Sequence, residues 1–217
     1  MSADGGSGRR LVLLRHGRTA WNATGRAQGH ADVELDDTGH AQASAAAPWV
    51  AGFDPVALWS SDLARARQTA AYVEKETGLE ARLDPRLREF DVGARTGMTM
   101  AEFAADHPDE HAAWVRERRA ELPGAEDTTE VLARTLPAYD DVVTALPPAG
   151  TAVVVTHGAA LKVTVLDLLG WPQHHTQQLR GLDNCAVAIL ETDGPAAGWQ
   201  LLAWNLRPDF VPDEAGR

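Results

Sequence analysis

Two short, continuous apolar runs constrain the fold of this chain more than any other feature. Residues 11–14 read LVLL, and residues 150–156 read GTAVVVT, which is rich in β-branched side chains. Runs of this length and composition are typical of strands that are covered on both faces. They predict a central sheet with helices on both sides. Each run ends in a His-Gly pair, at His16 and at His157.

Helical signals fill most of the chain between and after these runs. Helices are expected over residues 37–52, 61–78, 99–121, 127–146 and 157–170. Ser61 is the expected cap of the second helix and Gly78 its end, while Pro108 is expected to interrupt the third and Pro137 to kink or break the fourth. Two neighbouring strands are expected at 184–191 and 198–205, joined by a polar turn at 193–195.

This order of elements predicts an α/β protein, a three-layer α/β/α sandwich with a mostly parallel central sheet. One domain is expected over residues 9–207, with flexible tails at 1–8 and 208–217. In such sheets, ligands bind beyond the carboxyl ends of the strands. His16 and His157 both follow a buried strand, so the two imidazoles are expected to converge there.

Composition excludes several classes of function. The 217 residues include 31 acidic and 20 basic side chains, a formal charge of −11, which argues against binding to nucleic acid or to an anionic membrane. The single Cys185 predicts a reducing compartment, and we expect it to be a core residue rather than a nucleophile. Because no apolar run approaches the roughly 18 residues of a membrane span, we expect a cytoplasmic protein without a membrane partner.

The stretch LVLLRHGRTAWN at residues 11–22 carries the strongest chemical signal. A lone histidine at a strand end is more often structural than catalytic, but His16 follows Arg15, and Thr19 and Asn22 add polar groups in the next loop. Gly17 lets the backbone approach a ligand closely. Backbone N–H groups in such a turn can bind an anion, and a phosphoryl group is the anion that best fits adjacent arginine and histidine.

This stretch resembles the R-H-G-x-T-x-x-N signature of the histidine phosphatase superfamily, the family that includes cofactor-dependent phosphoglycerate mutase. Four further blocks resemble the family in the expected order, at residues 26–43, 60–70, 87–93 and 153–158. The resemblance implies a phosphoglycerate mutase-like fold and a metal-independent phosphomonoester hydrolase of the phosphatase branch. It also makes a homodimer plausible.

The matched positions imply a role for each catalytic residue. His16 would be the nucleophile that forms a phosphohistidine, since a neutral imidazole attacks well at neutral pH and a covalent intermediate splits one difficult displacement into two. Arg15, Arg65 and His157 would meet the negative charge on the phosphoryl oxygens. Glu89 would protonate the leaving oxygen and later activate water.

Two of these positions have a competing neighbour. Arg67 shares a helix with Arg65 but lies about 200° further round it, so we expect Arg67 to be solvated. Asp91 is two residues from Glu89, which occupies the motif position, and we expect Asp91 to bond the loop backbone.

Further positions are expected to bind the substrate or its phosphate: Gly17, Thr19, Asn22, Gln28, Gly29 and Gly158. Neither a metal nor another cofactor is expected, because this chemistry requires none. Paired His174 and His175 lack acidic or cysteine partners and are expected to be solvated.

Departures from the family pattern favour a phosphatase over a mutase. Mutases carry E-R-H-Y-G-like residues where this chain has EFDVG at 89–93, and ARTGMT at 94–99 replaces a frequent tryptophan-acidic-glycine run. The expected substrates are small phosphorylated sugars or glycerates. A phosphoglycerate mutase and a non-catalytic protein that binds a phospho-ligand are the alternatives. The lid-like region 94–127 is unassigned, and three arginines either recognise a second acidic group or are simply solvated: Arg88, Arg95 and Arg180.

Overall fold

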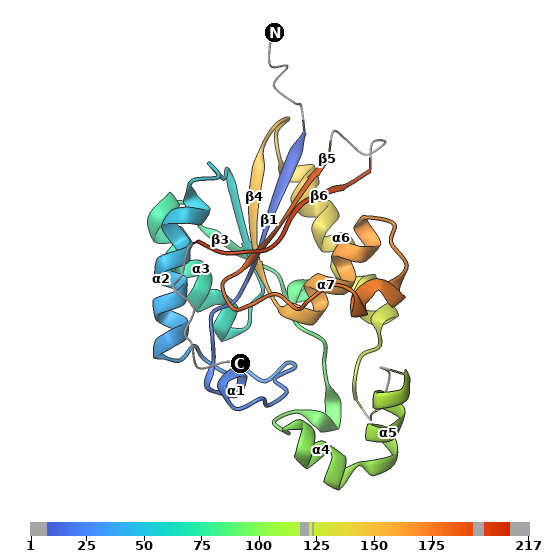
Figure 1. Cartoon of the computed structure of the whole chain (residues 1–217). Helices are drawn as coiled ribbons and strands as arrows, with labels where there is room; N and C mark the ends of the chain where they lie inside the picture. The colour runs from blue at the N-terminus through green and yellow to red at the C-terminus, as the bar shows by residue number, and fades with distance from the viewer. Residues whose placement is uncertain (1–7, 118–121, 123, 193–197, 209–217) are drawn as a thin grey trace.

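The computed structural model describes residues 8–117, 122, 124–192 and 198–208. Six strands form one sheet in the order β3-β2-β4-β1-β5-β6 (Figure 1). The strands are β1 (Arg9–Arg15), β2 (Ala57–Ser60), β3 (Ala81–Leu83), β4 (Thr151–Thr156), β5 (Val187–Thr192) and β6 (Gln200–Leu206).

The two apolar runs of the sequence form the central strands. Strands β1 and β4 are parallel neighbours, with Arg15 opposite Thr156, so His16 and His157 leave the sheet at the same edge. Strands β2 and β3 continue the parallel part, whereas β5 and β6 are antiparallel to their neighbours. The predicted α/β fold with a mostly parallel sheet is confirmed.

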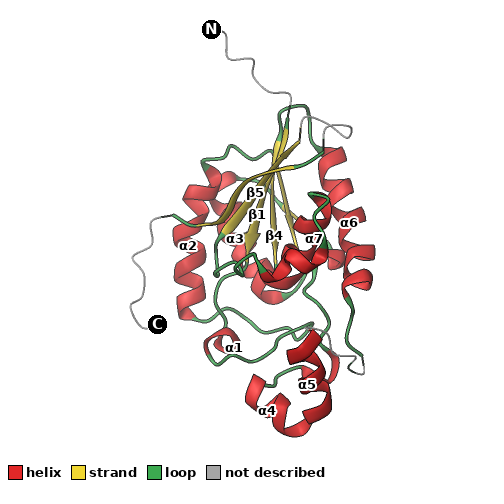
Figure 2. Ribbon diagram, turned by 45° about the vertical axis from the view of Figure 1, so that its right-hand side comes forward, coloured by secondary structure: helices red, strands yellow, loops and turns green. Residues whose placement is uncertain are grey.

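Helices cover both faces of the sheet. The helices are α1 (Ala20–Ala23), α2 (Asp37–Ala51), α3 (Ala64–Thr77), α4 (Met100–Asp106), α5 (Pro108–Glu117), α6 (Thr128–Ala145) and α7 (Gly158–Leu168). Short 3-10 turns are η1 (Pro85–Leu87), η2 (Gly93–Arg95) and η3 (Gln173–Gln177). Helices α2 and α3 lie against one face, and α6 and α7 against the other (Figures 1 and 2).

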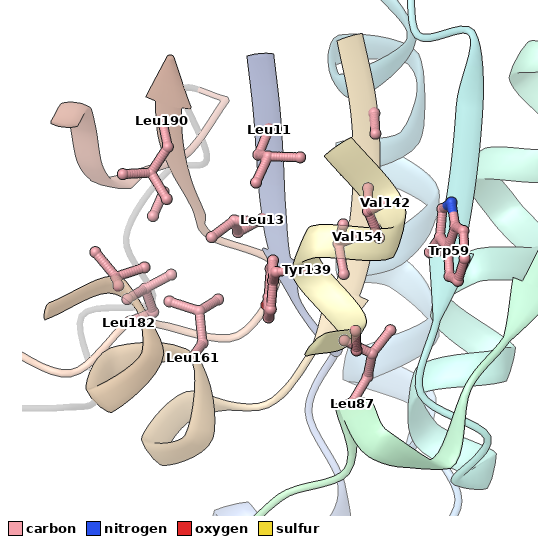
Figure 3. Close-up of a cluster of buried hydrophobic side chains, with 14 of the residues drawn as sticks. Leu11, Leu13, Trp59, Leu87, Tyr139, Val142, Val154, Leu161, Leu182 and Leu190 are labelled. Atoms are coloured by element: carbon pink, nitrogen blue, oxygen red, sulfur yellow. The ribbon is translucent and has the colours of Figure 1, made fainter. Parts of the chain in front are cut away.

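Alternation along β1 builds the two halves of the core. Leu11 and Leu13 point towards α6 and α7, where they join Tyr139 (Figure 3). Val12 and Leu14 belong to the cluster under α2 and α3. Because successive side chains of a strand alternate between faces, one continuous apolar run buries both layers.

Some local predictions hold and others are wrong. Gly78 ends α3 in the left-handed conformation at φ 73°, and Pro108 separates α4 from α5. Helix α6 continues through Pro137, so the break expected there does not occur. Ser61 does not cap α3, which begins at Ala64 and has no side-chain cap. The predicted turn at 193–195 lies outside the described residues, as do the predicted tails apart from Gly8 and Pro208.

Helices α4 and α5 lie beyond the carboxyl edge of β1, on the same side as α1 (Figures 1 and 2). Thr99 begins α4 with the predicted capping box, in which its hydroxyl accepts from the Glu102 N–H and the Glu102 carboxylate accepts from the Thr99 N–H. No helix among the described residues is long and apolar enough to cross a membrane.

Candidate active site

A cavity of about 230 Å³ opens beyond the carboxyl ends of the central strands. Its lining includes these residues singled out from the sequence: Arg15, His16, Asn22, Gln28, Gly29, Arg65, Glu89 and Arg95. With Arg26, which also lines it, the cavity combines four arginines, an imidazole and a carboxylate from segments far apart in the chain.

His16 directly follows β1, and its backbone N–H donates to Thr156 O at 3.0 Å. Its Nδ1 lies 2.7 Å from Gly17 O. A carbonyl oxygen only accepts, so Nδ1 carries the proton and Nε2 keeps its lone pair. Burial, followed by the charges of Arg65 and Arg15, holds the pKa of His16 well below 6.5. The imidazole is therefore a neutral base with its nucleophilic nitrogen available.

Arg65 and Arg15 place two cations beside this imidazole. Arg65 is fully buried at the start of α3 and donates to Ala31 O and Gly29 O, both at 2.8 Å. Burial lowers its pKa to about 10, so the guanidinium stays charged at neutral pH. Arg15 donates to Leu182 O. The Nε atoms of both arginines are buried and lack a hydrogen-bond partner among the described residues, which leaves donors for an anion.

His157 follows β4, and its ring centroid lies 5.1 Å from that of His16. It is fully buried, and burial is the main reason that its pKa lies well below 6.5. Its Nε2 lies 2.8 Å from Ser61 Oγ, whereas Nδ1 lacks a partner within the described chain. In the tautomer in which Nε2 accepts from the serine hydroxyl, a neutral His157 presents Nδ1–H as a donor.

The prediction that Ser61 caps a helix is wrong. Ser61 lies just after β2, and its N–H donates to Val155 O at 2.9 Å, which places it beside the end of β4. A serine before a helical stretch usually indicates a helix cap. The feature that could have indicated the active site instead is that Ser61 follows the end of a parallel strand.

Glu89 lies between η1 and η2, with its carboxylate at the start of α7. The Ala159 and Ala160 N–H groups donate to it at 3.0 and 2.8 Å, and the Phe90 N–H donates at 2.9 Å. A helix N-terminus stabilises a negative group through its free N–H donors and dipole. Asp91 instead accepts from the Gly93 N–H at 2.9 Å, which confirms its predicted bond to the loop backbone.

Arg134 of α6 holds the segment that carries Glu89, and the sequence did not single it out. It donates to the carbonyl oxygens of Arg86, Arg88 and Glu89 at 2.9, 2.7 and 2.8 Å. Two further bonds, both 2.7 Å, join it to the Glu126 carboxylate. Nothing in the local sequence distinguishes Arg134 from an exposed helical arginine.

Three predicted binding residues lie outside the lining of the cavity. Gly17 donates to Thr69 Oγ1 at 3.0 Å, and a Cβ on it would lie 2.6 Å from Gly39 O. Its missing side chain thus permits close contact with the start of α2. Thr19 is buried and caps α1 through a capping box with Asn22, and Gly158 is the first residue of α7.

The remaining arginines considered in the sequence analysis differ in their surroundings. Arg67 is exposed, as predicted. Arg88 forms a two-point ion pair with Asp62 at 2.7 and 2.6 Å, and Arg180 has a side chain that is 78% exposed. Arg95 is the one of the three uncertain arginines that lines the cavity. Among the described residues, no three His, Cys, Asp or Glu side chains are grouped so that they could hold a metal ion. His174 and His175 therefore belong to no such group.

Comparison with known proteins identifies the family. The family model of the histidine phosphatase superfamily (branch 1) matches residues 11–207. The chain belongs to this superfamily. The resemblance seen in the sequence is confirmed, and the protein is a phosphatase of the histidine phosphatase family.

The named relatives include phosphatases and a probable mutase. Glucosyl-3-phosphoglycerate phosphatase of Mycobacterium tuberculosis is 36% identical over 218 residues, covering 94% of this chain and 98% of the relative. A probable phosphoglycerate mutase of Yersinia pestis is 34% identical over 193 residues, covering 87% and 89%. The solved structure of mycobacterial glucosyl-3-phosphoglycerate phosphatase with VO3 has a TM-score of 0.83 at 37% identity, covering 91% of this chain and 98% of that one.

Proposed function

We propose that this histidine phosphatase hydrolyses phosphomonoesters of small sugars or glycerates, without a metal, through a phosphohistidine on His16 Nε2. The observation that carries the proposal is the hydrogen bond from His16 Nδ1 to Gly17 O, which leaves Nε2 unprotonated. Arg15, Arg65 and Glu89 line the same cavity. An imidazole, two guanidinium groups and a carboxyl group thus line one cavity, and these are the groups that the proposed chemistry needs.

In the first step, the Nε2 lone pair forms a bond to phosphorus while the bond from phosphorus to the ester oxygen breaks. Glu89, in its protonated form, gives a proton to the departing oxygen. Arg15 and Arg65 stabilise charge on the phosphoryl oxygens, and His157 contributes its Nδ1–H. The products are an alcohol and phospho-His16.

In the second step, water attacks phosphorus and Glu89 accepts one of its protons. The nitrogen–phosphorus bond breaks, inorganic phosphate leaves, and His16 returns to its starting form. Because the same carboxyl group donates in one step and accepts in the next, each turnover restores its proton.

The substrate class rests on the named relatives and on the size of the cavity. A volume of about 230 Å³ suits a small phosphorylated molecule. Glucosyl-3-phosphoglycerate is a candidate substrate because the mycobacterial relatives are named for it. The single, buried Cys185 supports action in a reducing compartment such as the cytoplasm.

Phosphate release tests the proposal. Wild-type enzyme, His16→Ala and Glu89→Gln would be compared on para-nitrophenyl phosphate, phosphorylated sugars and phosphoglycerates, with EDTA present. We expect wild-type turnover to survive EDTA and His16→Ala to lose it. Arg67→Ala, which removes an exposed arginine of the same helix, is the matched control and should retain activity.

The same assay separates the alternatives. Isomerisation of phosphoglycerate that outpaces phosphate release would indicate a mutase. Tight phosphate binding by wild-type enzyme with no turnover of any compound would refute the hydrolase and indicate a phospho-ligand binding protein.

A further inference from the structure

Arg95 is a cation of the cavity to which the proposed chemistry gives no role. It ends η2, on the segment that leads from the sheet towards α4. Its carbonyl accepts from the Met98 N–H, and two bonds fix this turn to Ala27: Gly97 N–H to Ala27 O at 2.8 Å and Ala27 N–H to Met98 O at 3.0 Å. The turn is therefore anchored to a loop that also lines the cavity.

Among the side chains that the structure describes, the guanidinium group of Arg95 has aromatic rings but no carboxylate beside it. It lies 5.6 Å from the ring centroid of Phe103 and 5.6 Å from that of Trp114. Its Nε is buried and has no hydrogen-bond partner among the described residues. Burial alone lowers its pKa. Arg95 as a whole is half-buried. Ring faces attract a cation but do not accept all its N–H bonds, and an anionic partner offsets the loss of water around a partly buried cation.

The other arginines of the cavity already have partners. Arg26 forms two bonds to the Glu102 carboxylate, at 2.7 and 3.0 Å, and a third to Gly97 O. Arg15 and Arg65 donate to backbone carbonyls and are stabilised electrostatically by Glu89. Within the described part of the chain, Arg95 is thus the cavity arginine that lacks both a carboxylate and a carbonyl partner.

We propose that Arg95 binds a carboxylate of the substrate and makes the enzyme selective for phosphomonoesters that carry one. The inference rests on the proposed function, because it assumes that the phosphoryl group lies at His16. A carboxylate matches the planar fork of one guanidinium and carries a single charge. A second phosphate would bring up to two negative charges. Arg95 would have to meet them without Arg26, because the nearby Arg26 is already neutralised by Glu102.

The position of Arg95 supports a role in specificity rather than in the shared chemistry. It ends η2, away from the strand ends that are followed by His16 and His157. The rings of Phe103 and Trp114 come from α4 and α5, so the helices beyond the sheet hold the guanidinium while the sheet edge holds the nucleophile.

Two nearly isosteric substrates test the proposal: 3-phosphoglycerate, and glycerol 3-phosphate, which has a hydroxymethyl group in place of the carboxylate. We expect Arg95→Gln to lower kcat/KM for 3-phosphoglycerate by about 10- to 100-fold, the usual effect of losing a charge-assisted hydrogen bond. The value for glycerol 3-phosphate should change by less than about twofold, because neither phosphoryl transfer nor binding of the neutral alcohol uses Arg95. Arg95→Lys should recover part of the loss.

Arg180→Gln is the control, since it removes the same charge from an exposed side chain outside the cavity. Equal losses on both substrates, or no loss on 3-phosphoglycerate, would overturn the role of Arg95. A larger loss on fructose 1,6-bisphosphate than on 3-phosphoglycerate would overturn the choice of a carboxylate. Failure of wild-type enzyme to hydrolyse either ester would instead refute the proposed function, so the two failures are distinct.

Discussion

Replacement of Arg134 by methionine tests whether the hydrogen bonds of this side chain fix the position of Glu89. The change removes five hydrogen bonds, three to backbone carbonyls around Glu89 and two to the Glu126 carboxylate. Each bond contributes about 0.5–1.5 kcal/mol net, and losses within one network are not additive. We therefore expect the free energy of unfolding to fall by about 2–4 kcal/mol.

The kinetic effect of Arg134→Met should depend on the leaving group. A shift of about 1 Å in a reacting group costs on the order of 100-fold in rate, and proton donation matters most for an alkoxide, which leaves poorly. We expect kcat/KM for an alkyl ester such as glycerol 3-phosphate to fall by about 10- to 100-fold. The value for para-nitrophenyl phosphate, whose leaving group needs little protonation, should fall much less.

Urea unfolding and the two values of kcat/KM measure these effects. Arg86→Met is the matched control, because Arg86 pairs with Asp84 and Asp141 and its side chain does not bond the Glu89 segment. Arg86→Met should lower the free energy of unfolding, and its effect on kcat/KM should not differ between the two esters. Equal losses on both esters in Arg134→Met would refute the positioning role and leave a purely structural one.

Three further outcomes follow from the site. The pKa values of His16 and His157 lie well below 6.5 in the folded protein, so the unfolded state binds more protons as pH falls below about 6.5. The free energy of unfolding, measured in urea, should therefore decline in that range. A flat profile would contradict the burial of neutral imidazoles. Gly17→Ala should lower the free energy of unfolding by roughly 1–3 kcal/mol or more, since its Cβ would meet Gly39 O at 2.6 Å, and an unchanged melting temperature would show that this contact is not tight. Ser61→Ala should lower kcat/KM by about 10-fold through loss of the bond to His157 Nε2, with Ser60→Ala as the neighbouring control, and equal activity of the two variants would refute this role.

The fold and the centre of the site could be predicted because local patterns determine both. Continuous apolar runs identified two buried strands, and parallel pairing brought the residues after them, His16 and His157, to one edge. Arg65 could be separated from Arg67 by the family pattern together with helical geometry, and the structure buries the first and exposes the second.

Features that depend on distant contacts could not be read from the sequence. Arg134 contacts carbonyls more than forty residues away, and Gly17 lacks a side chain because Gly39 lies against it. Ser61 had a local interpretation as a helix cap, whereas its bond to His157 spans 96 residues. In each case the partner is set by how the elements meet, and the local sequence is compatible with another role.

Trapping the phosphoenzyme tests the central claim most directly. Wild-type enzyme would be mixed with a phosphomonoester, quenched in alkali to preserve phosphohistidine, and mapped by mass spectrometry, with phosphorus NMR to distinguish the two ring nitrogens. We expect phosphate on Nε2 of His16, and none in His16→Ala. Phosphate on His157 or on another residue, or turnover by direct attack of water with inversion at a chiral phosphorus, would refute the phosphohistidine mechanism on His16.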